Sequence, residues 1–94
     1  MRKIKIKIQL EADRSLPTYQ SKDAAGCDLI NIGESVKLYP LDRAVINTGV
    51  HIQLPEGYEA QVRGRSGLNR DHGIVVPTGT IDADYRGEIR VVVY

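Results

Sequence analysis

Apolar and polar residues alternate strictly in residues 3–8, where Ile4, Ile6 and Ile8 are separated by lysines. Successive side chains of a β-strand point to opposite faces, so this pattern predicts a strand with one apolar and one basic face. The basic face could bind phosphate groups, but no aromatic residues interleave with the lysines to stack bases. We therefore expect a solvated face whose lysines keep the strand edge from pairing with other chains.

Two later stretches give further strand and turn signals. Residues 50–54 alternate, the sequence Pro55-Glu56-Gly57 breaks the run, and residues 58–62 alternate again, which predicts a β-hairpin. Residues 74–76 are apolar and β-branched and lead into a second turn signal at residues 77–79. Both stretches favour short strands joined by Gly and Pro turns.

The last strand signal, residues 88–94, is rich in β-branched side chains and stops within an apolar run. An exposed apolar edge invites pairing, so we expect either that another chain covers it or that the polypeptide continues beyond Tyr94. Helical spacing is confined to a turn or two within residues 66–72. The pattern predicts one all-β domain over residues 1–94, C-terminally incomplete, as a sandwich or barrel with minimal helix. With no Phe or Trp, its core must be built from Ile, Val and Leu.

Composition narrows the class of protein. The 94 residues, 41% hydrophobic and 27% charged, allow one small domain and argue against disorder. A formal net charge of +1 argues against bulk nucleic-acid binding, which favours a large basic excess. No apolar stretch approaches the roughly 20 residues that span a bilayer, and no signal peptide is evident. The single Cys27 fits a reducing compartment, so we expect a cytoplasmic domain without a membrane or nucleic-acid partner.

Three clusters of small and polar residues interrupt the strand pattern, at residues 24–29, 64–68 and 79–87. The first places one carboxylate among small residues. The second offers a guanidinium, a hydroxyl and free backbone amides, which suit phosphate oxygens. The third combines two carboxylates with a phenol and a guanidinium. Each cluster alone could be structural: a tight packing site, a turn with a surface arginine, and a salt-bridged loop.

Other reactive side chains have no evident partners in the sequence. Asp82 and Asp84 would point to opposite faces of an extended segment, so we do not expect them to form one catalytic dyad. His51 lies on the polar face of its strand and His72 lies in a loop, and neither has a Cys or His at metal-ligand spacing. We expect both histidines to be solvated. Cys27 is expected to be a small buried residue rather than a nucleophile, because no base is placed to activate it.

Taken together and in this order, the three clusters resemble motifs of the trimeric dUTP diphosphatases (dUTPases), and the resemblance covers essentially the whole chain. It implies a distorted jelly-roll chain that forms a homotrimer and hydrolyses dUTP to dUMP and pyrophosphate, by Mg²⁺-assisted water attack on the α-phosphorus. By this resemblance, Asp82 deprotonates the water, Asp28 meets Mg²⁺ through ordered water, and the ring of Tyr85 packs on the deoxyribose. The resemblance also assigns contacts with the triphosphate to Arg65, Ser66 and Gly67. By the same resemblance, main-chain contacts with uracil come from Gly79, Thr80, Ile81 and Arg90.

Two features depart from the family pattern. Gly64 stands where the family usually has Pro, which should loosen the backbone ahead of the phosphate-binding residues. Two further family motifs, a strand segment and a mobile Gly-rich tail that closes over the nucleotide, would follow Tyr94. Two other interpretations therefore stay open: a dUTP-binding or interaction module with impaired catalysis, and an enzyme related to dCTP deaminase.

Overall fold

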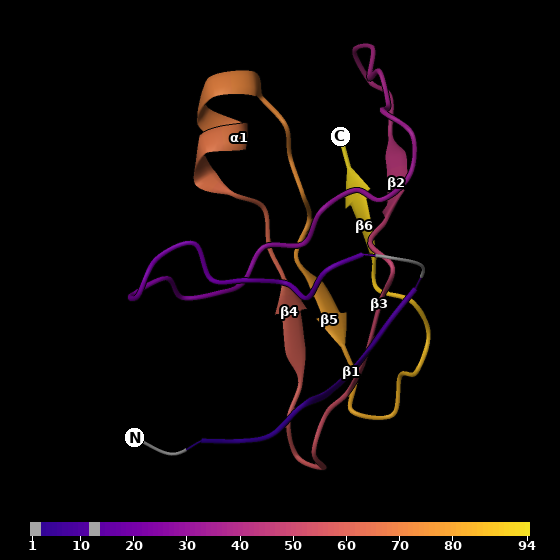
Figure 1. Ribbon diagram of the computed structural model, residues 1–94. Helices are drawn as coiled ribbons and strands as arrows, with labels where there is room; N and C mark the ends of the chain where they lie inside the picture. The colour runs from indigo at the N-terminus through magenta and orange to yellow at the C-terminus, as the bar shows by residue number, and fades with distance from the viewer. Residues whose placement is uncertain (1–2, 12–13) are drawn as a thin grey trace.

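The computed structural model describes residues 3–11 and 14–94, which form short strands and one short helix (Figure 1). The elements in chain order are β1 (Lys7–Leu10), β2 (Ala44–Asn47), β3 (Val50–Gln53), β4 (Ala60–Val62), α1 (Ser66–His72), β5 (Gly79–Ile81) and β6 (Arg90–Val93). The predicted all-β class with minimal helix is confirmed. Among the described residues, no helix has the length and apolar character needed to cross a membrane.

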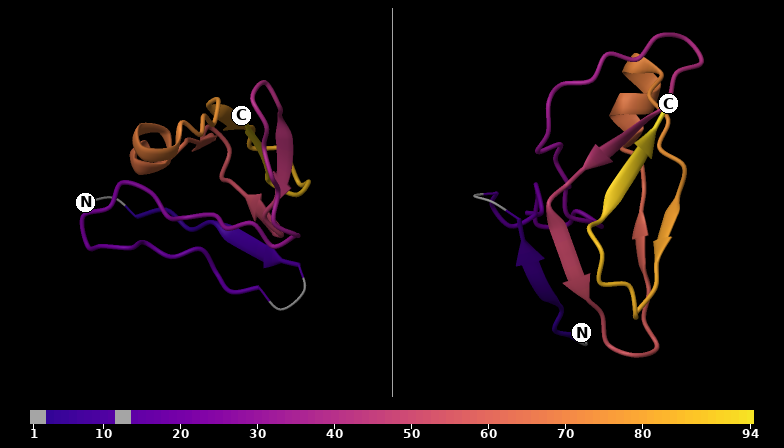
Figure 2. Two further views of the ribbon diagram at one scale, coloured as in Figure 1. Left: turned by 90° about the horizontal axis from the view of Figure 1, so that it is seen from above. Right: turned by 90° about the vertical axis from the view of Figure 1, so that its right-hand side faces the viewer.

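The strands pair two by two, in antiparallel fashion: β1 with β3, β2 with β6, and β4 with β5. These sheets are small and do not close on one another as a continuous barrel within the described part of the chain. Between β1 and β2 the chain is mostly irregular, with one isolated bridge joining Thr18 to Asp28. In Figure 1 and in the right-hand view of Figure 2, α1 and the C-terminal end of β6 lie toward the same end of the molecule.

The hairpin predicted for residues 50–62 is wrong in its pairing. The turn forms, since Tyr58 N–H donates to the Pro55 carbonyl at 3.2 Å and Gly57 adopts a φ of +88°. However, β3 takes β1 as its partner and β4 takes β5. The second turn signal also fails, because Gly79 is the first residue of β5. Alternation and turn residues identify strands, but the choice of partner is made by contacts distant in sequence.

The N-terminal strand is shorter than predicted and its apolar face is not buried within the chain. Only Lys7–Leu10 form β1, with Leu10 opposite Val50. Ile4, Ile6 and Ile8 are each 42% exposed. The expectation of a half-buried strand from residue 3 onward is therefore corrected.

The core is small and aliphatic, as the absence of Phe and Trp predicts. Val50, Ile81 and Ile89 are almost fully buried and form one cluster. The partly buried hydrophobic residues packed against it are Leu10, Leu29, Ile52, Ala60 and Val62. Ile81 ends β5 and Ile89 immediately precedes β6, so the core anchors both ends of the connection between these strands.

A polar clamp fixes the same connection from the β2–β3 turn. The buried Thr48 hydroxyl donates to the Ile89 carbonyl at 2.5 Å, and Gly49 N–H donates to a Glu88 carboxylate oxygen at 2.9 Å. Ile89 N–H in turn donates to the Val50 carbonyl at 2.8 Å. Gly49 has a φ of +69°, and a Cβ there would lie 2.7 Å from Ile32 Cδ1, so this turn requires glycine.

The C-terminal strand lies between two partners. β6 pairs with β2 along one edge, while the backbone of Tyr94 exchanges two hydrogen bonds with that of Val75, at 2.9 and 3.1 Å. The predicted strand at residues 74–76 is thus reduced to this contact. The expected exposed edge is partly covered by the chain itself.

Candidate functional site

The third cluster lines a cavity of about 310 Å³ between β5 and β6, which we call the β5–β6 cavity. Six residues that the sequence assigned to one site lie here together: Gly79, Thr80, Ile81, Asp82, Tyr85 and Arg90. The other lining residues are Val62, Glu88 and Ile89. β5 and β6 each pair with another strand. The backbone groups of β5 and β6 that border this cavity therefore do not form a ladder with each other.

Asp82 follows β5 directly and begins the turn that leads to β6. Its carbonyl accepts a hydrogen bond from Tyr85 N–H at 3.1 Å, which closes the turn. Its carboxylate is exposed, and no hydrogen bond or ion pair within residues 3–11 and 14–94 engages it. Asp84 does not line the cavity, in keeping with the expectation that the two carboxylates do not form a dyad. Asp82 is therefore the carboxylate available to accept a proton from a water in this cavity.

The ring of Tyr85 is folded back over its own turn. Its hydroxyl donates to the Glu88 carbonyl at 2.7 Å, and a Cβ on Gly87 would lie 2.5 Å from that hydroxyl oxygen. Arg86 stiffens the same turn by donating to the carbonyls of Ala83, at 2.6 Å, and Tyr85, at 3.2 Å. The ring of Tyr85 can take this position because residue 87 is a glycine and has no side chain.

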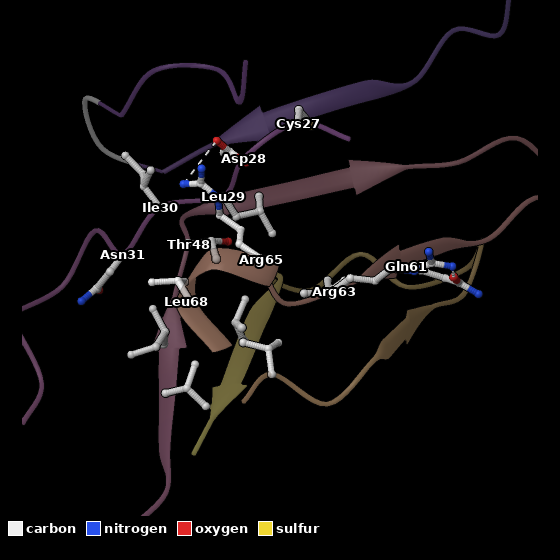
Figure 3. Close-up of a pocket in the computed structure, with 15 residues that line it drawn as sticks. Cys27, Asp28, Leu29, Ile30, Asn31, Thr48, Gln61, Arg63, Arg65 and Leu68 are labelled. Atoms are coloured by element: carbon white, nitrogen blue, oxygen red, sulfur yellow. Dashed lines mark hydrogen bonds and ion pairs between the residues drawn. The ribbon is translucent and has the colours of Figure 1, made fainter. Parts of the chain in front are cut away.

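The first two clusters meet at a second cavity, of about 270 Å³, which we call the β2–α1 cavity (Figure 3). Asp28 and Arg65 face each other across it, with Asp28 Oδ2 and Arg65 Nη1 3.9 Å apart. The Arg65 side chain is 69% exposed, so this loose ion pair adds little stability and leaves the guanidinium accessible. Ser66 and Gly67 begin α1 beside Arg65 but do not line the cavity.

Cys27 also lines the β2–α1 cavity and is exposed, which corrects the expectation of a buried thiol. The small residues that precede Cys27 predicted tight packing there, yet Ala25 and Gly26 are themselves exposed. A sequence pattern of small residues cannot distinguish close packing from an open loop.

The two cavities are separate. Of all their lining residues only Val62 belongs to both. Within one chain, the phosphate-type residue Arg65 and the candidate base Asp82 therefore do not line the same space.

Gly64 has a packing reason that the sequence did not reveal. A Cβ at this position would lie 3.1 Å from Val76 Cβ, tighter than ordinary side-chain contact. Residues 62–65 thus approach the segment before β5 closely, and the glycine permits that approach.

The described residues offer few side chains that could bind a divalent cation. No group of three or more His, Cys, Asp and Glu side chains that could hold a metal occurs in the described part of the chain. Mg²⁺ commonly keeps several waters and takes one or two carboxylates together with substrate phosphates. The half-buried Asp28 carboxylate, accessible in its cavity, fits that limited role.

His51 and Glu88 are the residues near the site that sequence reasoning missed. His51 was expected to be solvated, but its Nδ1 lies 2.9 Å from the Arg86 carbonyl and its Nε2 lies 2.6 Å from Glu11 Oε2. These contacts, the Arg86 carbonyl first, raise the pKa of His51. His72 is exposed, as expected, but it is the last residue of α1 and does not lie in a loop. No local signal marks His51, because both of its partners are about 35 to 40 positions away in the chain.

Comparison with known proteins shows which family this chain resembles in sequence. The dUTPase family model matches residues 12–94. The chain is 54% identical over 87 residues to the deoxyuridine 5'-triphosphate nucleotidohydrolase of Chlamydia pneumoniae, covering 89% of this chain and 60% of that protein. It is 46% identical over 96 residues to the same enzyme of Fusobacterium nucleatum subsp. nucleatum, covering 99% of this chain and 66% of that protein.

Comparison with solved structures points to the same family. A dUTPase of phage phi11 of S. aureus, described as coordinating a structural Mg(II) ion, superposes with a TM-score of 0.87 at 33% identity, over 96% of this chain and 59% of that one. A dUTPase of Staphylococcus bacteriophage 80alpha, solved with dUpNHpp, gives 0.87 at 33% identity, over 95% and 53%. The chain thus spans about 60% of the length of the first curated relatives it matches. On the family match, these identities and a shared strand arrangement, the chain belongs to the dUTPase family.

Proposed function

We propose that this chain supplies the nucleotide-binding and catalytic part of a dUTP diphosphatase, which converts dUTP and water to dUMP and pyrophosphate. The observation that carries the proposal is the β5–β6 cavity. It gathers Asp82, Tyr85 and the β5 backbone around one space, with the Asp82 carboxylate free of protein partners in the described residues. The names of the curated relatives support the same reaction.

Main-chain groups are suited to hold the pyrimidine. The edges of β5 and of the residues leading into β6 border the cavity without pairing to each other. A base whose edge carries alternating donors and acceptors can take the place of the absent strand. Main-chain recognition is rigid here because Ile81 and Ile89 are buried in the core and Glu88 is held by the polar clamp. A closed fit would exclude the 5-methyl group of thymine by shape.

Tyr85 provides selectivity for the deoxy sugar. A ring packed against the C2′ side leaves no space for a hydroxyl, and burying that hydroxyl without a partner carries a further desolvation cost. The hydroxyl bond to the Glu88 carbonyl fixes the ring in place before the nucleotide binds.

The chemical step requires a base and charge compensation. Asp82 accepts a proton from water as the water oxygen bonds to the α-phosphorus, and the bond to the oxygen bridging the α- and β-phosphorus breaks, releasing pyrophosphate. Arg65, Ser66 and Gly67 contribute donors to the phosphate oxygens. Asp28 is the residue that would help to hold a Mg²⁺ ion through water, and that ion would supply neutralisation of the triphosphate charge.

The separation of the two cavities favours a site shared between chains. Arg65 and Asp82 of one chain line different spaces, so a site using both is completed most simply by a second copy. This supports the homotrimer implied by the family resemblance. The same separation favours the second candidate function, a chain that binds deoxyuridine nucleotides but does not hydrolyse them when alone.

Replacement of Asp82 by Asn tests the proposal. We expect Asp82→Asn to lower kcat for pyrophosphate release from dUTP by about 10²- to 10⁴-fold, because general-base catalysis contributes that much. Affinity for the non-hydrolysed analogue dUpNHpp should stay within a few-fold. Asp84→Asn is the matched control, since it removes a neighbouring carboxylate that does not line the cavity.

Turnover that survives Asp82→Asn would remove the assigned base. Binding of dUpNHpp without turnover in the unmodified chain would favour the binding module. Ammonia release from dCTP would instead favour the deaminase-related alternative.

A further inference from the structure

His51 links two separate parts of the fold. It lies in β3 with its side chain 26% exposed, and its two ring nitrogens reach in different directions. Nδ1 lies 2.9 Å from the carbonyl oxygen of Arg86, and Nε2 lies 2.6 Å from Oε2 of Glu11, just after β1. One imidazole thus bridges the end of the β1–β3 pair and the turn between Asp82 and Glu88.

The chemistry of these partners determines the protonation state of the ring. A carbonyl oxygen and a carboxylate oxygen only accept hydrogen bonds, so both ring nitrogens must donate. A neutral imidazole has one N–H, whereas the imidazolium has two. The arrangement is therefore satisfied only by the charged ring.

The charges around His51 act in both directions. The pKa of His51 is raised, first by the Arg86 carbonyl, then by the Glu11 hydrogen bond and the charges of Glu11 and Glu88, while burial opposes this. Lys7 and Arg86 line the same recess as His51, and their positive charges favour the neutral ring. The Arg86 guanidinium, however, is turned to the Ala83 and Tyr85 carbonyls of its own turn.

The Arg86 carbonyl is a key position in the turn. It lies between Tyr85, whose ring borders the β5–β6 cavity, and Gly87, on which that ring rests. Among the hydrogen bonds of the described residues, the one from His51 is the only one that reaches residues 83–87 from outside the turn. The other hydrogen bonds of residues 83–87 in the described part of the chain are internal to the turn and do not tie it to a strand.

We propose that His51, as an imidazolium, is a positioning residue that holds the turn of residues 82–88 against β3, so that deoxyuridine nucleotides bind more weakly once the ring loses its proton. This rests on the proposed function, since the turn carries Asp82 and Tyr85. A group whose pKa is raised in the folded state keeps its contact at low pH and loses it as the pH rises through that folded-state pKa. Binding should therefore weaken from about neutral pH upward, above the ordinary histidine range near pH 6.5.

The test compares four forms of the full chain between about pH 6 and about pH 8.5. These are the unmodified chain, His51→Gln, Glu11→Gln and the matched control His72→Gln, which alters the other histidine at an exposed position. The first readout is the dissociation constant of dUpNHpp. Dividing the value for each variant by that for the unmodified chain at the same pH cancels titration of the ligand itself. The second readout needs no nucleotide: the backbone amide NMR shifts of residues 85–87 and the ring protons of His51.

We expect the ratio of dissociation constants for His51→Gln to change by about three- to tenfold across the range, the scale of one ordinary intramolecular hydrogen bond. In Glu11→Gln the inflection should move to lower pH, because the stabilising carboxylate charge is gone. The amides of residues 85–87 should titrate with the His51 ring in the unmodified chain and not in His51→Gln. His72→Gln should follow the unmodified chain.

Measurable binding with the same pH profile in all four forms would overturn the role of His51. Amides of residues 85–87 that do not follow the His51 ring would also overturn it, even if one variant folds poorly. Absence of dUpNHpp binding at every pH would instead count against the proposed function itself.

Discussion

At the scale of single residues, the site depends on a glycine as much as on the reactive groups. The Tyr85 ring can lie across the turn only because Gly87 has no side chain, since a Cβ there would approach the ring oxygen to 2.5 Å. Such a contact forces either the ring or the backbone to move. The position of the ring, and with it the proposed discrimination between deoxy- and ribonucleotides, is therefore coupled to residue 87.

Gly87→Ala should displace the Tyr85 ring and reduce the preference for dUTP over UTP. We expect kcat/KM for dUTP to fall by about ten- to a hundredfold, the effect of misplacing a group that positions substrate by about 1 Å, with a smaller change for UTP. Steady-state kinetics with both nucleotides measure this. In a Tyr85→Ala background, Gly87→Ala should add little, because the group that it displaces is already absent. A full additional loss in that background would show that Gly87 acts by another route.

The family resemblance predicted the β5–β6 group, from Gly79 to Arg90, and these residues do line one cavity because they are close in sequence and a turn keeps them close in space. His51 and Cys27 were predicted wrongly for the opposite reason. The surroundings of His51 come from Glu11 and Arg86, and the exposure of Cys27 depends on an irregular segment whose path no local pattern defines.

At the scale of elements, the strand before α1 and the segment before β5 are packed too closely for an ordinary side chain at residue 64. The Cβ of an alanine there would lie 3.1 Å from Val76 Cβ. Two effects then oppose each other. Replacing Gly stabilises by about 0.4–1 kcal/mol through the unfolded chain, whereas overpacking costs about 1–3 kcal/mol. The contact with Val76 decides whether Gly64→Ala stabilises or destabilises the fold.

Gly64→Ala should therefore destabilise the fold, and the same change in a Val76→Gly background, which removes the contacting Cβ, should be neutral or stabilising. We expect a coupling energy of about 1 kcal/mol between the two positions, measured by urea unfolding of the four forms of a double-mutant cycle. An equal effect of Gly64→Ala in both backgrounds would exclude the Val76 contact as the reason for the glycine.

The strands themselves were largely predictable and their partners were not. Period-two alternation identified residues 50–54 and 58–62, but β3 pairs with the N-terminal β1 and β4 pairs with β5. Pairing depends on side-chain contacts across the molecule, including the Val50–Ile81–Ile89 cluster, which joins β3 to both ends of the β5–β6 connection. The cavity between β5 and β6 exists because of that pairing, so its shape could not come from the sequence pattern.

At the scale of the whole molecule, one chain divides the candidate catalytic groups between two cavities that share only Val62. A triphosphate held by Arg65 in the β2–α1 cavity would lie outside the cavity that Asp82 of the same chain lines. In a closed symmetric assembly, by contrast, each contact between copies repeats identically, so one surface of a chain can complete the site of the next.

Mixing two inactive variants tests this sharing. Arg65→Ala and Asp82→Asn should each abolish most dUTP turnover, and an equimolar mixture of the two, unfolded and refolded together, should recover it at about a quarter of the sites, as random pairing gives. Pyrophosphate release measures the recovery, and light scattering should give three times the mass of one chain. Recovery absent from a mixture that does assemble would place both residues of each site on the same chain.

Titration of ¹⁵N-labelled chain with dUMP decides whether a deoxyuridine nucleotide occupies the β5–β6 cavity. If it does, backbone amide shifts should be concentrated at Gly79–Ile81 and at residues 82–90 and should saturate together with one dissociation constant. Saturable shifts that instead fall on a distant surface, such as the recess formed by residues 36–42 and 72–74, with residues 79–90 unmoved, would contradict this occupancy.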